Sequence, residues 1–361
     1  MSERSILVIQ TAFVGDVVLT TPLLRALKRS APAVRLTVLT TPAGANLLEG
    51  SPFVDARIPY RKKGPGAGPL GLARVVRSLR GSRFDVAIVA QRSFRSGFLA
   101  VAAGARRRIG FAGAAGSWAY TRRVPWEGMR HAVYRYLALG RALEIDPATA
   151  DPHPQLDPPQ EAQARADALL REAGLDPAGP LLAVAPGSVW GTKRWTPEGY
   201  AKVLGEAERR LGVRSFLVGS SDERALCEAI AARSGGAVPD LAGKSDLAVL
   251  AALLARASVL LTNDSGPGHV ASAVRTPVVS IFGPTVPEFG YTAFGGANRV
   301  VQRDALPCRP CHSHGPQVCP LGHHRCMTEI APSTVLDVVE SVLAETGRAE
   351  RPQRTEEVRP G

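Results

Sequence analysis

The sequence predicts an α/β protein with two parallel-sheet domains that face each other across a cleft. Two observations support this prediction: apolar runs alternate with helix-length segments, and a proline-rich break lies near the middle of the chain. Strands buried on both faces of a parallel sheet are apolar nearly throughout. The alternating order of strand and helix favours right-handed crossovers within such sheets. A chain of 361 residues is long enough for two domains of ordinary size.

Seven apolar runs are predicted to be strands, and six of the segments between them are predicted to be helices. The predicted strands are residues 5–10, 35–40, 85–90, 181–185, 214–219, 258–262 and 277–282. The predicted helices are residues 18–29, 70–80, 160–173, 196–211, 222–234 and 246–256, with a further helix beginning near His269.

The segment DPATADPHPQLDPPQ, residues 146–160, predicts the interdomain linker. Proline disfavours both helices and sheet ladders, so no regular element is expected there. We therefore divide the chain into an N-terminal domain (1–150), a linker with a connecting helix (151–178), a C-terminal domain (179–345) and a tail (346–361). The tail is polar and contains proline, which predicts disorder.

The positive charge of the chain is concentrated in its first part. Residues 1–150 contain 23 Lys and Arg against 8 Asp and Glu, a net charge of +15. The whole chain has a net charge of +12, so the remaining residues have a net charge of −3. A basic half indicates an anionic partner such as nucleic acid, an acidic membrane face or a phosphorylated substrate. Coding bias towards arginine is the alternative explanation. The chain carries no signature of a nucleic-acid-binding module, so no nucleic-acid partner is expected.

The sequence also bears on cellular location. No apolar run approaches the ~18–20 residues that a membrane-spanning helix needs. The start, MSERSILVIQ, lacks the apolar region of an export signal and leads directly into a predicted strand. A cytoplasmic protein is therefore expected.

Ligands of parallel sheets bind at the carboxyl ends of the strands, so polar residues that follow strands are candidates for a site. The first group is QTAFVGDVVLTTPLLRAL, residues 10–27, which holds the single carboxylate Asp16. Asp16 either caps the following helix or faces a substrate. The second is APGSVWGTKRWTPEGYAKVL, residues 185–204, with Ser188 and Lys193 in a loop and Thr196 as a helix N-cap.

Two more groups follow strands of the second domain. In VGSSDERALCEAI, residues 218–230, Ser220 or Ser221 is expected to cap a helix that carries Glu223 in its first turn. In LLTNDSGPGHVASAV, residues 260–274, a glycine-rich turn leads into a helix. The exposed amides and positive dipole end of a helix start suit a phosphate group. A structural turn with a core histidine is the alternative.

The segments GDVVLTTPLLRALK, APGSVWGTKRWTPEGY, NDSGPGHVASAVRTPVVSIFGPT and CPLGHHRCM, in this order, resemble glycosyltransferase family 9. Within the family the resemblance is greatest to the ADP-heptose:lipopolysaccharide heptosyltransferase II group, and it extends from residue 5 to about residue 343. It implies the GT-B fold, two Rossmann-like domains facing across a cleft. It also implies transfer of heptose from ADP-heptose, with inversion at the anomeric carbon, to a heptosyl-Kdo-lipid A inner core.

The resemblance assigns roles to individual residues. Asp16 corresponds to the general base, and Lys193 to the cation that stabilises the departing diphosphate. The other donor-binding residues that it implies are Ser188, Glu223, Asp264, Ser265, Gly266 and His269. Asp264 is expected to contact the donor sugar or a loop amide, and His269 to hold the diphosphate or to order the turn. Glu223, or Asp222 beside it, is expected to bind ribose hydroxyls or to complement the helix dipole.

The acceptor that the resemblance implies is a phosphorylated Kdo-lipid A core at the cytoplasmic face of the inner membrane, whose anionic surface would attract the basic half. The residues expected to contact the acceptor are Gly15, Arg61, Lys62, Arg92 and Arg122, with Lys63, Arg95 and Arg123 as further candidates. The chain has no D-x-D sequence, which fits countercharge supplied by protein groups, so no obligate cofactor is expected.

Four of the five cysteines, Cys308, Cys311, Cys319 and Cys326, fall in one histidine-containing segment. Their number suits a structural zinc site, although the second pair is spaced more widely than is usual. A disulfide is disfavoured in the cytoplasm, and reduced thiols in a packed loop are the third interpretation.

Three functions therefore remain open for the chain. It is an inverting heptosyltransferase, another family 9 enzyme with a different core acceptor or donor, or a non-catalytic nucleotide-sugar or lipopolysaccharide-binding protein. A binding protein has no need of a base and a diphosphate cation together, so Asp16 and Lys193 discriminate between these functions.

Overall fold

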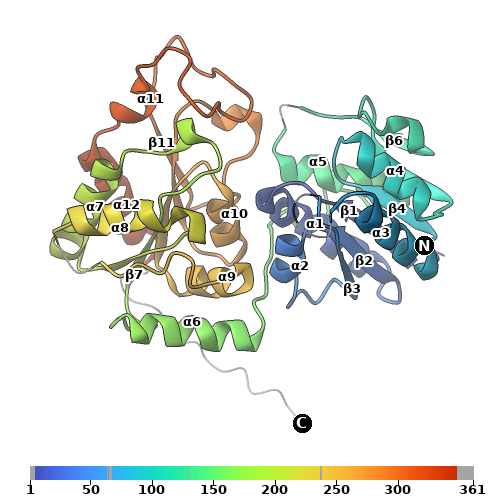
Figure 1. Cartoon of the computed structure of the whole chain (residues 1–361), viewed down its shortest axis with the longest axis horizontal. Helices are drawn as coiled ribbons and strands as arrows, with labels where there is room; N and C mark the ends of the chain where they lie inside the picture. Colours follow the sequence, from blue (N-terminus) through green and yellow to red (C-terminus); the bar gives the residue numbers. More distant parts are fainter. Residues whose placement is uncertain (1–4, 63, 65–66, 129, 236–237, 348–361) are drawn as a thin grey trace.

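The computed structural model describes residues 5–62, 64, 67–128, 130–235 and 238–347, which form two parallel β-sheets with helices on their faces (Figure 1). The predicted tail lies outside these residues, apart from residues 346 and 347, and so does Lys63. The first sheet has the strand order β3-β2-β1-β4-β5-β6 and the second has the order β11-β10-β9-β7-β8. Every strand pair is parallel, as the apolar runs predicted.

The strands of the first sheet are β1 (Ser5–Gln10), β2 (Arg35–Thr40), β3 (Ala56–Pro59), β4 (Val86–Val89), β5 (Arg107–Phe111) and β6 (Arg122–Val124). The strands of the second are β7 (Leu181–Ala185), β8 (Arg214–Leu217), β9 (Val259–Asn263), β10 (Val278–Phe282) and β11 (Arg299–Gln302). All seven predicted strands are present. The four strands that the sequence did not predict are β3, β5, β6 and β11, and each contains arginine, which interrupts the apolar pattern.

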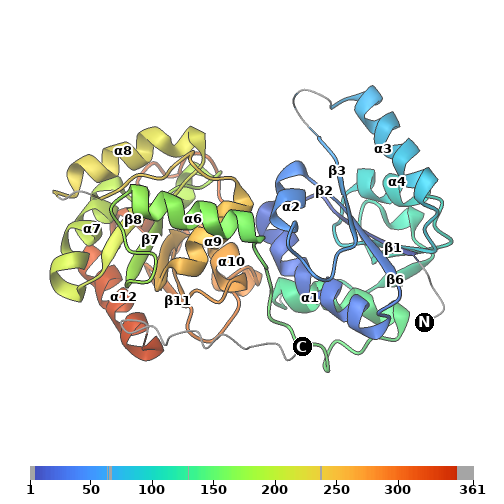
Figure 2. The same cartoon turned by 90° about the horizontal axis from the view of Figure 1, so that it is seen from below.

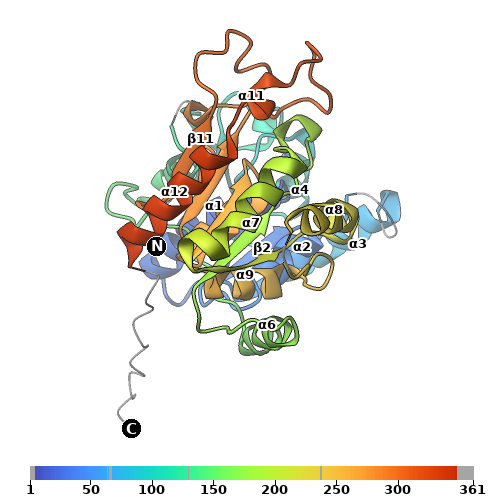
Figure 3. The ribbon, with the colours of Figure 1, turned by 90° about the vertical axis from the view of Figure 1, so that its left-hand side faces the viewer.

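The first half of the chain contains α1 (Val14–Ser30), α2 (Pro42–Leu47), α3 (Pro69–Ser82), α4 (Phe94–Ala102) and α5 (Ala132–Ala138). The second half contains α6 (Gln160–Glu172), α7 (Pro197–Leu211), α8 (Arg224–Arg233), α9 (Leu247–Arg256), α10 (Gly266–Ala273), α11 (Arg325–Thr328) and α12 (Pro332–Thr346). Helix α12 packs beside α7 on the second sheet, and the two lie side by side in Figure 3. None of the helices in these described stretches has the length and apolar character needed to cross a bilayer.

Helix α1 begins four residues earlier than the sequence predicted. Its N-cap is Phe13, which makes Asp16 the third residue of the helix and not the cap. The helix continues through Pro22, which cannot donate to the carbonyl of Val18. The Thr21 hydroxyl donates to that carbonyl instead, at 2.7 Å, and so keeps the group satisfied.

The proline-rich segment between the halves has no regular structure, but it is held against α1 (Figure 2). The buried Arg25 guanidinium donates to the carbonyls of Asp151 and His153, at 2.7 and 2.8 Å, and to the Gln155 side chain at 2.9 Å. The Gln155 amide donates in turn to Thr21 Oγ1 at 3.0 Å. The segment then enters α6, which packs on α9 of the second half.

The two halves also meet directly. Helix α1 contacts α10, and α2 contacts α9. Across the second contact, the Asn46 side chain donates to Asp246 at 3.1 Å and accepts from the Ala248 amide at 2.9 Å. The segment that follows β10 reaches α5, where the Ala132 amide donates to the Gly290 carbonyl at 2.8 Å. These contacts place the carboxyl ends of strands from both sheets around one space.

Candidate active site

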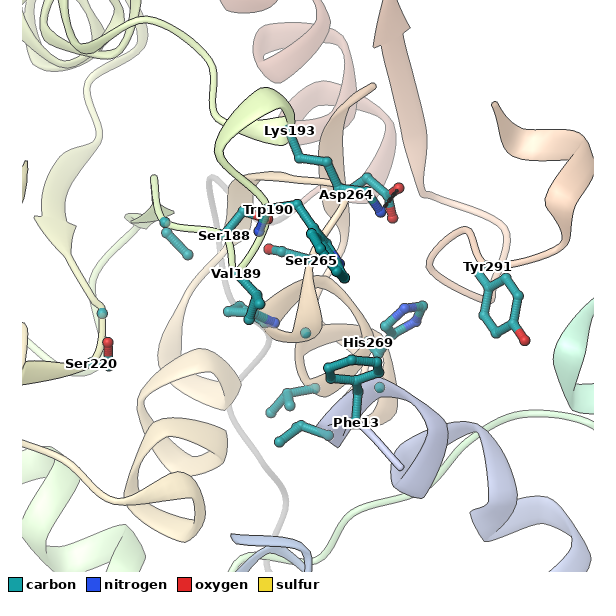
Figure 4. A pocket seen from close by; sticks show the side chains of 18 of the residues that line it. Phe13, Ser188, Val189, Trp190, Lys193, Ser220, Asp264, Ser265, His269 and Tyr291 are labelled. Atoms are coloured by element: carbon teal, nitrogen blue, oxygen red, sulfur yellow. Dashed lines mark hydrogen bonds and ion pairs between the residues drawn. The ribbon is translucent and has the colours of Figure 1, made fainter. Parts of the chain in front are cut away.

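A cavity of about 500 Å³ lies between the two halves of the chain. Its first-half wall is the turn after β1, Phe13 to Asp16. Its second-half wall comes from the turns that follow β7, β8, β9 and β10, with contributions from the start of α9 and from the cysteine-rich loop. Figure 4 shows Lys193 and Asp264 together on one side of the cavity, with Phe13 and His269 on the other. The polar residues of both halves that sequence reasoning selected after strand ends therefore meet at one site.

Asp16 is held by two hydrogen bonds. Its Oδ2 accepts from the Phe13 amide at 3.3 Å, which helps to satisfy the start of α1. Its Oδ1 accepts from the Tyr136 hydroxyl of α5 at 2.6 Å. Asp16 is therefore not the N-cap that the sequence left as one alternative, but it supports the helix start from the third position and also lines the cavity.

The surroundings of Asp16 make it a better proton acceptor than an ordinary aspartate. Burial raises its pKa, and this effect outweighs the hydrogen bonds from Tyr136 and Phe13 and the charges of Arg135 and His314, which lower it. A raised pKa brings a carboxylate closer to the operating pH, which suits a general base. Tyr136 is buried and its own pKa is raised well above its usual value, chiefly by burial and then by Asp16, so it remains a hydrogen-bond donor.

Gly15 is required by the contact between the two halves. A Cβ atom at this position would lie 2.5 Å from His269 Cδ2 and 3.1 Å from His269 Nε2. Gly15 was predicted to let the backbone approach an acceptor sugar. It does line the cavity, but the neighbour that excludes a side chain is His269 of α10.

His269 is neutral at the boundary between the halves. It is 7% exposed, and burial lowers its pKa to about 4, although Asp264 acts in the opposite direction. Its Nδ1 is buried and has no hydrogen-bond partner among the described residues. A neutral imidazole with one unused nitrogen beside a cavity can donate to or accept from a bound group.

Lys193 and Asp264 form an ion pair at the opposite side of the cavity. Lys193 Nζ lies 2.5 Å from Asp264 Oδ2, and the two side chains are only 12% and 9% exposed. The same Oδ2 accepts from the Thr285 hydroxyl at 2.6 Å. Asp264 was expected to contact the donor sugar or a loop amide. In this structure it holds the Lys193 ammonium in the wall of the cavity.

Asn263 connects three segments of this wall. Its side chain is fully buried, and its Oδ1 accepts from the Trp195 amide and the Tyr200 hydroxyl, both at 2.9 Å. Its Nδ2 donates to the carbonyls of Pro186 at 2.7 Å and Gly187 at 3.2 Å. The end of β9 therefore fixes the loop that carries Lys193 and Ser188. Ser188 is buried and its hydroxyl accepts from the Trp190 amide at 3.3 Å.

The turn after β9 presents a helix start to the cavity. Ser265 is the N-cap of α10, and Gly266 and Pro267 are its first residues, so the helix begins earlier than the predicted start near His269. The Ser265 hydroxyl lies 3.1 Å from that of Thr262. Amides of a first helical turn have no partner within the helix and attract anions. The wall thus combines a lysine, hydroxyls and the start of a helix, groups that can bind an anion.

The sequence profile described as Glycosyltransferase family 9 (heptosyltransferase) matches residues 72–319. This chain belongs to glycosyltransferase family 9. It is 30% identical to lipopolysaccharide heptosyltransferase 2 of Salmonella typhimurium over 95% of its own length and 99% of that protein. It is 29% identical to lipopolysaccharide heptosyltransferase 2 of Escherichia coli, over 94% and 98% of the two chains.

The fold is also that of solved family 9 structures. A glycosyltransferase family 9 protein from Veillonella parvula superposes with a TM-score of 0.85 at 25% identity, covering 95% of this chain and 98% of that one. The ADP-heptose lipopolysaccharide heptosyltransferase II of E. coli superposes with a TM-score of 0.77 at 25% identity, covering 95% and 99%. The chain is therefore a glycosyltransferase with the GT-B fold, as the sequence predicted.

In this family 9 enzyme Glu223 lines the cavity beside Gly187. Its Oε2 accepts from the Ser220 amide at 2.8 Å and lies 3.1 Å from the Ser220 hydroxyl. Ser220 caps the short turn Ser221–Glu223 that precedes α8, as one of the two expected caps. The Glu223 carboxylate therefore stabilises the start of this turn and also lines the cavity.

The predicted acceptor arginines and lysine are arranged differently. Arg61, Lys62, Arg92 and Arg122 are exposed on the first half, and none of the four lines the cavity. Lys62 is the one electrostatically linked to the site: partial burial lowers its pKa, Arg95 lowers it further, and Asp16 raises it. Arg92 donates to the Gly113 carbonyl at 3.1 Å and lies over the Trp126 ring.

The four cysteines of the cysteine-rich loop lie near one another, since the other three thiols act on the pKa of Cys326. Nowhere in the described ranges do three His, Cys, Asp or Glu side chains group as metal ligands, and all five cysteines are free. Cys326 is buried, Cys308 and Cys319 are partly buried, and Cys311 is exposed. Cys227 lies in the core on α8, as expected.

The cysteine-rich loop also braces the loop that carries Lys193 in the second-half wall. His324 Nε2 lies 2.8 Å from the Thr192 carbonyl, and Gln317 Oε1 accepts from the Gly191 amide at 3.0 Å. The His314 ring stacks against Trp190, with ring centroids 6.3 Å apart. Ser313 and His314 also line the cavity, which the sequence did not predict.

Two further residues at the site were not predicted from sequence. Tyr136 lies in a segment with no motif, and Tyr291 lies in an irregular segment after β10. Burial raises the pKa of Tyr291, on which Tyr136 and Arg135 both act as well, and the Arg135 guanidinium lies 4.7 Å from the Tyr291 ring centroid. The only sequence signal was the density of aromatics around these positions, which is equally typical of a core.

Proposed function

We propose that this enzyme moves L-glycero-D-manno-heptose from ADP-heptose to a heptosyl-Kdo-lipid A acceptor during lipopolysaccharide inner-core biosynthesis, with inversion at the anomeric carbon. One observation carries the proposal: Asp16 of the first half and Lys193 of the second line the same cavity. The names of the Salmonella and E. coli relatives support heptose as the transferred sugar and lipopolysaccharide as the acceptor class.

In the proposed reaction the acceptor hydroxyl oxygen attacks the anomeric carbon of the bound heptose. The bond between that carbon and the phosphate oxygen breaks, and its electron pair leaves with ADP. The hydroxyl proton passes to the Asp16 carboxylate, whose raised pKa favours the transfer. Attack from the face opposite the leaving group inverts the anomeric centre.

The donor wall supplies the countercharge for the leaving diphosphate. The Lys193 ammonium would contact a phosphate oxygen while it keeps part of its contact with Asp264. Ser188, Ser265 and the first amides of α10 would donate hydrogen bonds to the diphosphate. Donors placed where charge develops stabilise a transition state more than a ground state. Glu223 lies beside Gly187 at the wall, where it could accept from ribose hydroxyls, and His269 is placed between donor and base.

We assign donor binding to residues 179–345 and acceptor binding to residues 1–150. The acceptor would be phosphorylated, since Arg61, Lys62, Arg92 and Arg122 are exposed on the half that carries Asp16. It would be met at the cytoplasmic face of the inner membrane. No resident metal is required by the groups that line the cavity, and the cysteine loop acts as a brace. Stoichiometric zinc or iron in freshly purified protein would contradict the last assignment.

The decisive experiment measures transfer of heptose from ADP-heptose to purified mono-heptosylated Kdo-lipid A by the wild type and by Asp16→Asn. We expect the variant to bind ADP-heptose normally and to lose at least ~10²-fold in kcat, the lower limit for loss of a general base. Asparagine keeps the side-chain shape and an acceptor for the Phe13 amide. Near-normal transfer by Asp16→Asn would contradict the base assignment, and transfer to a different core acceptor by the wild type would redefine the substrate.

A further inference from the structure

Helix α4 has two apolar faces, and only one of them is used by the core. Leu99, Ala100 and Ala102 are buried against the first sheet. Phe94, Phe98 and Val101 are exposed at 61%, 40% and 42%, although they are large and apolar. Their spacing places them along one side of the helix.

The exposed side of α4 is extended by a tryptophan from a neighbouring turn. Trp118 lies in the short turn Ser117–Ala119 after β5 and is 52% exposed. Its ring centroid is 5.4 Å from that of Phe94. The contact is made possible by two glycines, because a Cβ on Gly97 would lie 2.7 Å from the Gly116 carbonyl oxygen. The aromatic pair is thus held in place and still faces outward.

Basic residues surround this apolar strip. Residues 56–126 contain 15 Lys and Arg and a single acidic residue, Asp85. Arg92 and Arg95 flank Phe94, and Arg123 Nε donates to the Ser117 carbonyl at 3.2 Å beside Trp118. All three arginines are exposed. We call this set the α4 surface; it comprises Phe94, Phe98, Val101, Trp118, Arg92, Arg95 and Arg123.

The α4 surface begins at the same edge of the sheet as the candidate base. Strands β1 and β4 are parallel neighbours, so α1, which carries Asp16, and α4 both start at that edge. Figure 1 shows α4 on the side of the first half that is turned away from the second half. A flat partner could therefore cover the α4 surface without entering the contacts between the two halves.

We propose that the α4 surface docks the enzyme on an anionic lipid bilayer and so presents a lipid-anchored acceptor to Asp16. Aromatic side chains favour the interfacial region of bilayers, and arginines gain from the negative potential of acidic lipids. Exposed aromatic rings together with unbalanced positive charge suit an anionic bilayer. A second copy of the chain is a poorer partner, because its α4 surface carries the same positive charge and the two surfaces would repel each other. The role assigned to the bilayer rests on the proposed function, whereas the docking itself does not.

The test measures co-sedimentation of the full chain with vesicles of phosphatidylethanolamine and phosphatidylglycerol, and with vesicles of phosphatidylcholine. We expect binding to the anionic vesicles that weakens with added salt, and at least ~10-fold weaker binding for Phe94→Ser/Trp118→Ser, which lose two interfacial anchors. The matched control is Val318→Ser/Leu321→Ser, two residues that are 77% and 63% exposed on the second half and should bind as the wild type does.

A second measurement separates this inference from the proposed function. Transfer to a de-acylated, water-soluble acceptor should be unchanged in Phe94→Ser/Trp118→Ser, and transfer to the acylated acceptor in vesicles should fall by ~10-fold with the loss of docking. Equal vesicle binding by wild type and variant would overturn the docking surface, whatever the activity. So would sedimentation velocity showing a dimer that the variant abolishes, with no vesicle binding. Vesicle binding without transfer to either acceptor would instead overturn the proposed function alone.

Discussion

The two walls of the cavity are built in different ways. In the second-half wall Lys193, Asp264 and Asn263 are bound to one another's loops and to Thr285, so this wall, which we propose binds the donor, is fixed by internal hydrogen bonds. The first-half wall supplies one charged group to the cavity lining, the Asp16 carboxylate, with the buried Arg135 close enough to lower its pKa. The acceptor candidates Arg61, Lys62, Arg92 and Arg122 are exposed outside the cavity. A donor of constant structure suits a preorganised wall, and a large lipid acceptor suits a broad charged surface.

The largest loss of activity is expected when Lys193 of the second-half wall is replaced. Lys193→Met removes the countercharge for the leaving diphosphate, and we expect kcat to fall by ~10²–10³-fold, as for the loss of one transition-state donor. Steady-state transfer assays with ADP-heptose measure this loss. Lys202→Met is the matched control, because Lys202 lies on the exposed side of α7 and should leave kcat unchanged.

Removing Lys193 also leaves Asp264 as an uncompensated charge with 9% exposure, which can destabilise a protein by ~3–5 kcal/mol. The double variant Lys193→Met/Asp264→Asn removes both charges and should regain the thermal midpoint but not the activity. If the double variant transfers heptose at the wild-type rate, the countercharge for ADP comes from another group.

The contact between the walls can be tested at Gly15. Gly15→Ala places a methyl group 2.5 Å from the buried His269 ring, and we expect a loss of ~1–3 kcal/mol in the free energy of unfolding, as for overpacked cores. Thermal or urea unfolding measures it. Gly81→Ala on α3 is the matched control, since its new Cβ meets nothing within 4 Å and should be neutral or stabilising. Additive effects of Gly15→Ala and His269→Ala in a double-mutant cycle would show that the two residues do not compete for space.

The residues proposed to bind the donor could be selected from sequence because they are close to one another along the chain or follow apolar strands directly. Lys193, Ser188, Asp264 and Ser265 each lie within a short turn after a strand, and parallel topology then brings those turns together. The seven predicted strands could be recognised because they are buried along most of their length, which leaves an apolar run. Strand β6 gives no such signal, because two of its three residues are exposed arginines.

The environment of the base could not be predicted in this way. Tyr136 lies 120 positions from Asp16, and its contact depends on how α5 packs against α1. Tyr291 reaches the same place from the other half of the chain. Asp16 could be selected from the sequence as a candidate base. Its raised pKa and its hydrogen bond with Tyr136 result from tertiary packing, which cannot be predicted from the spacing of nearby residues.

The smallest expected effect tests whether Tyr136 tunes the base. The Tyr136 hydroxyl lowers the pKa of Asp16 against the dominant effect of burial, so Tyr136→Phe should raise that pKa further. The active form is the carboxylate, which is lost as pH falls through its pKa. The acid limb of the kcat/KM profile should therefore move to higher pH, with kcat lowered by about tenfold through poorer positioning of the base.

Tyr134→Phe is the matched control on the same helix, because Tyr134 packs on Phe294 and Arg130 and does not contact Asp16. Its pH profile should coincide with that of the wild type. If Tyr136→Phe lowers the rate but leaves the acid limb in place, Tyr136 only supports the packing of α5. A shifted acid limb would instead show that the protonation of Asp16 depends on Tyr136, a residue far away in the sequence. The position of the Lys193 loop depends in the same way on Asn263.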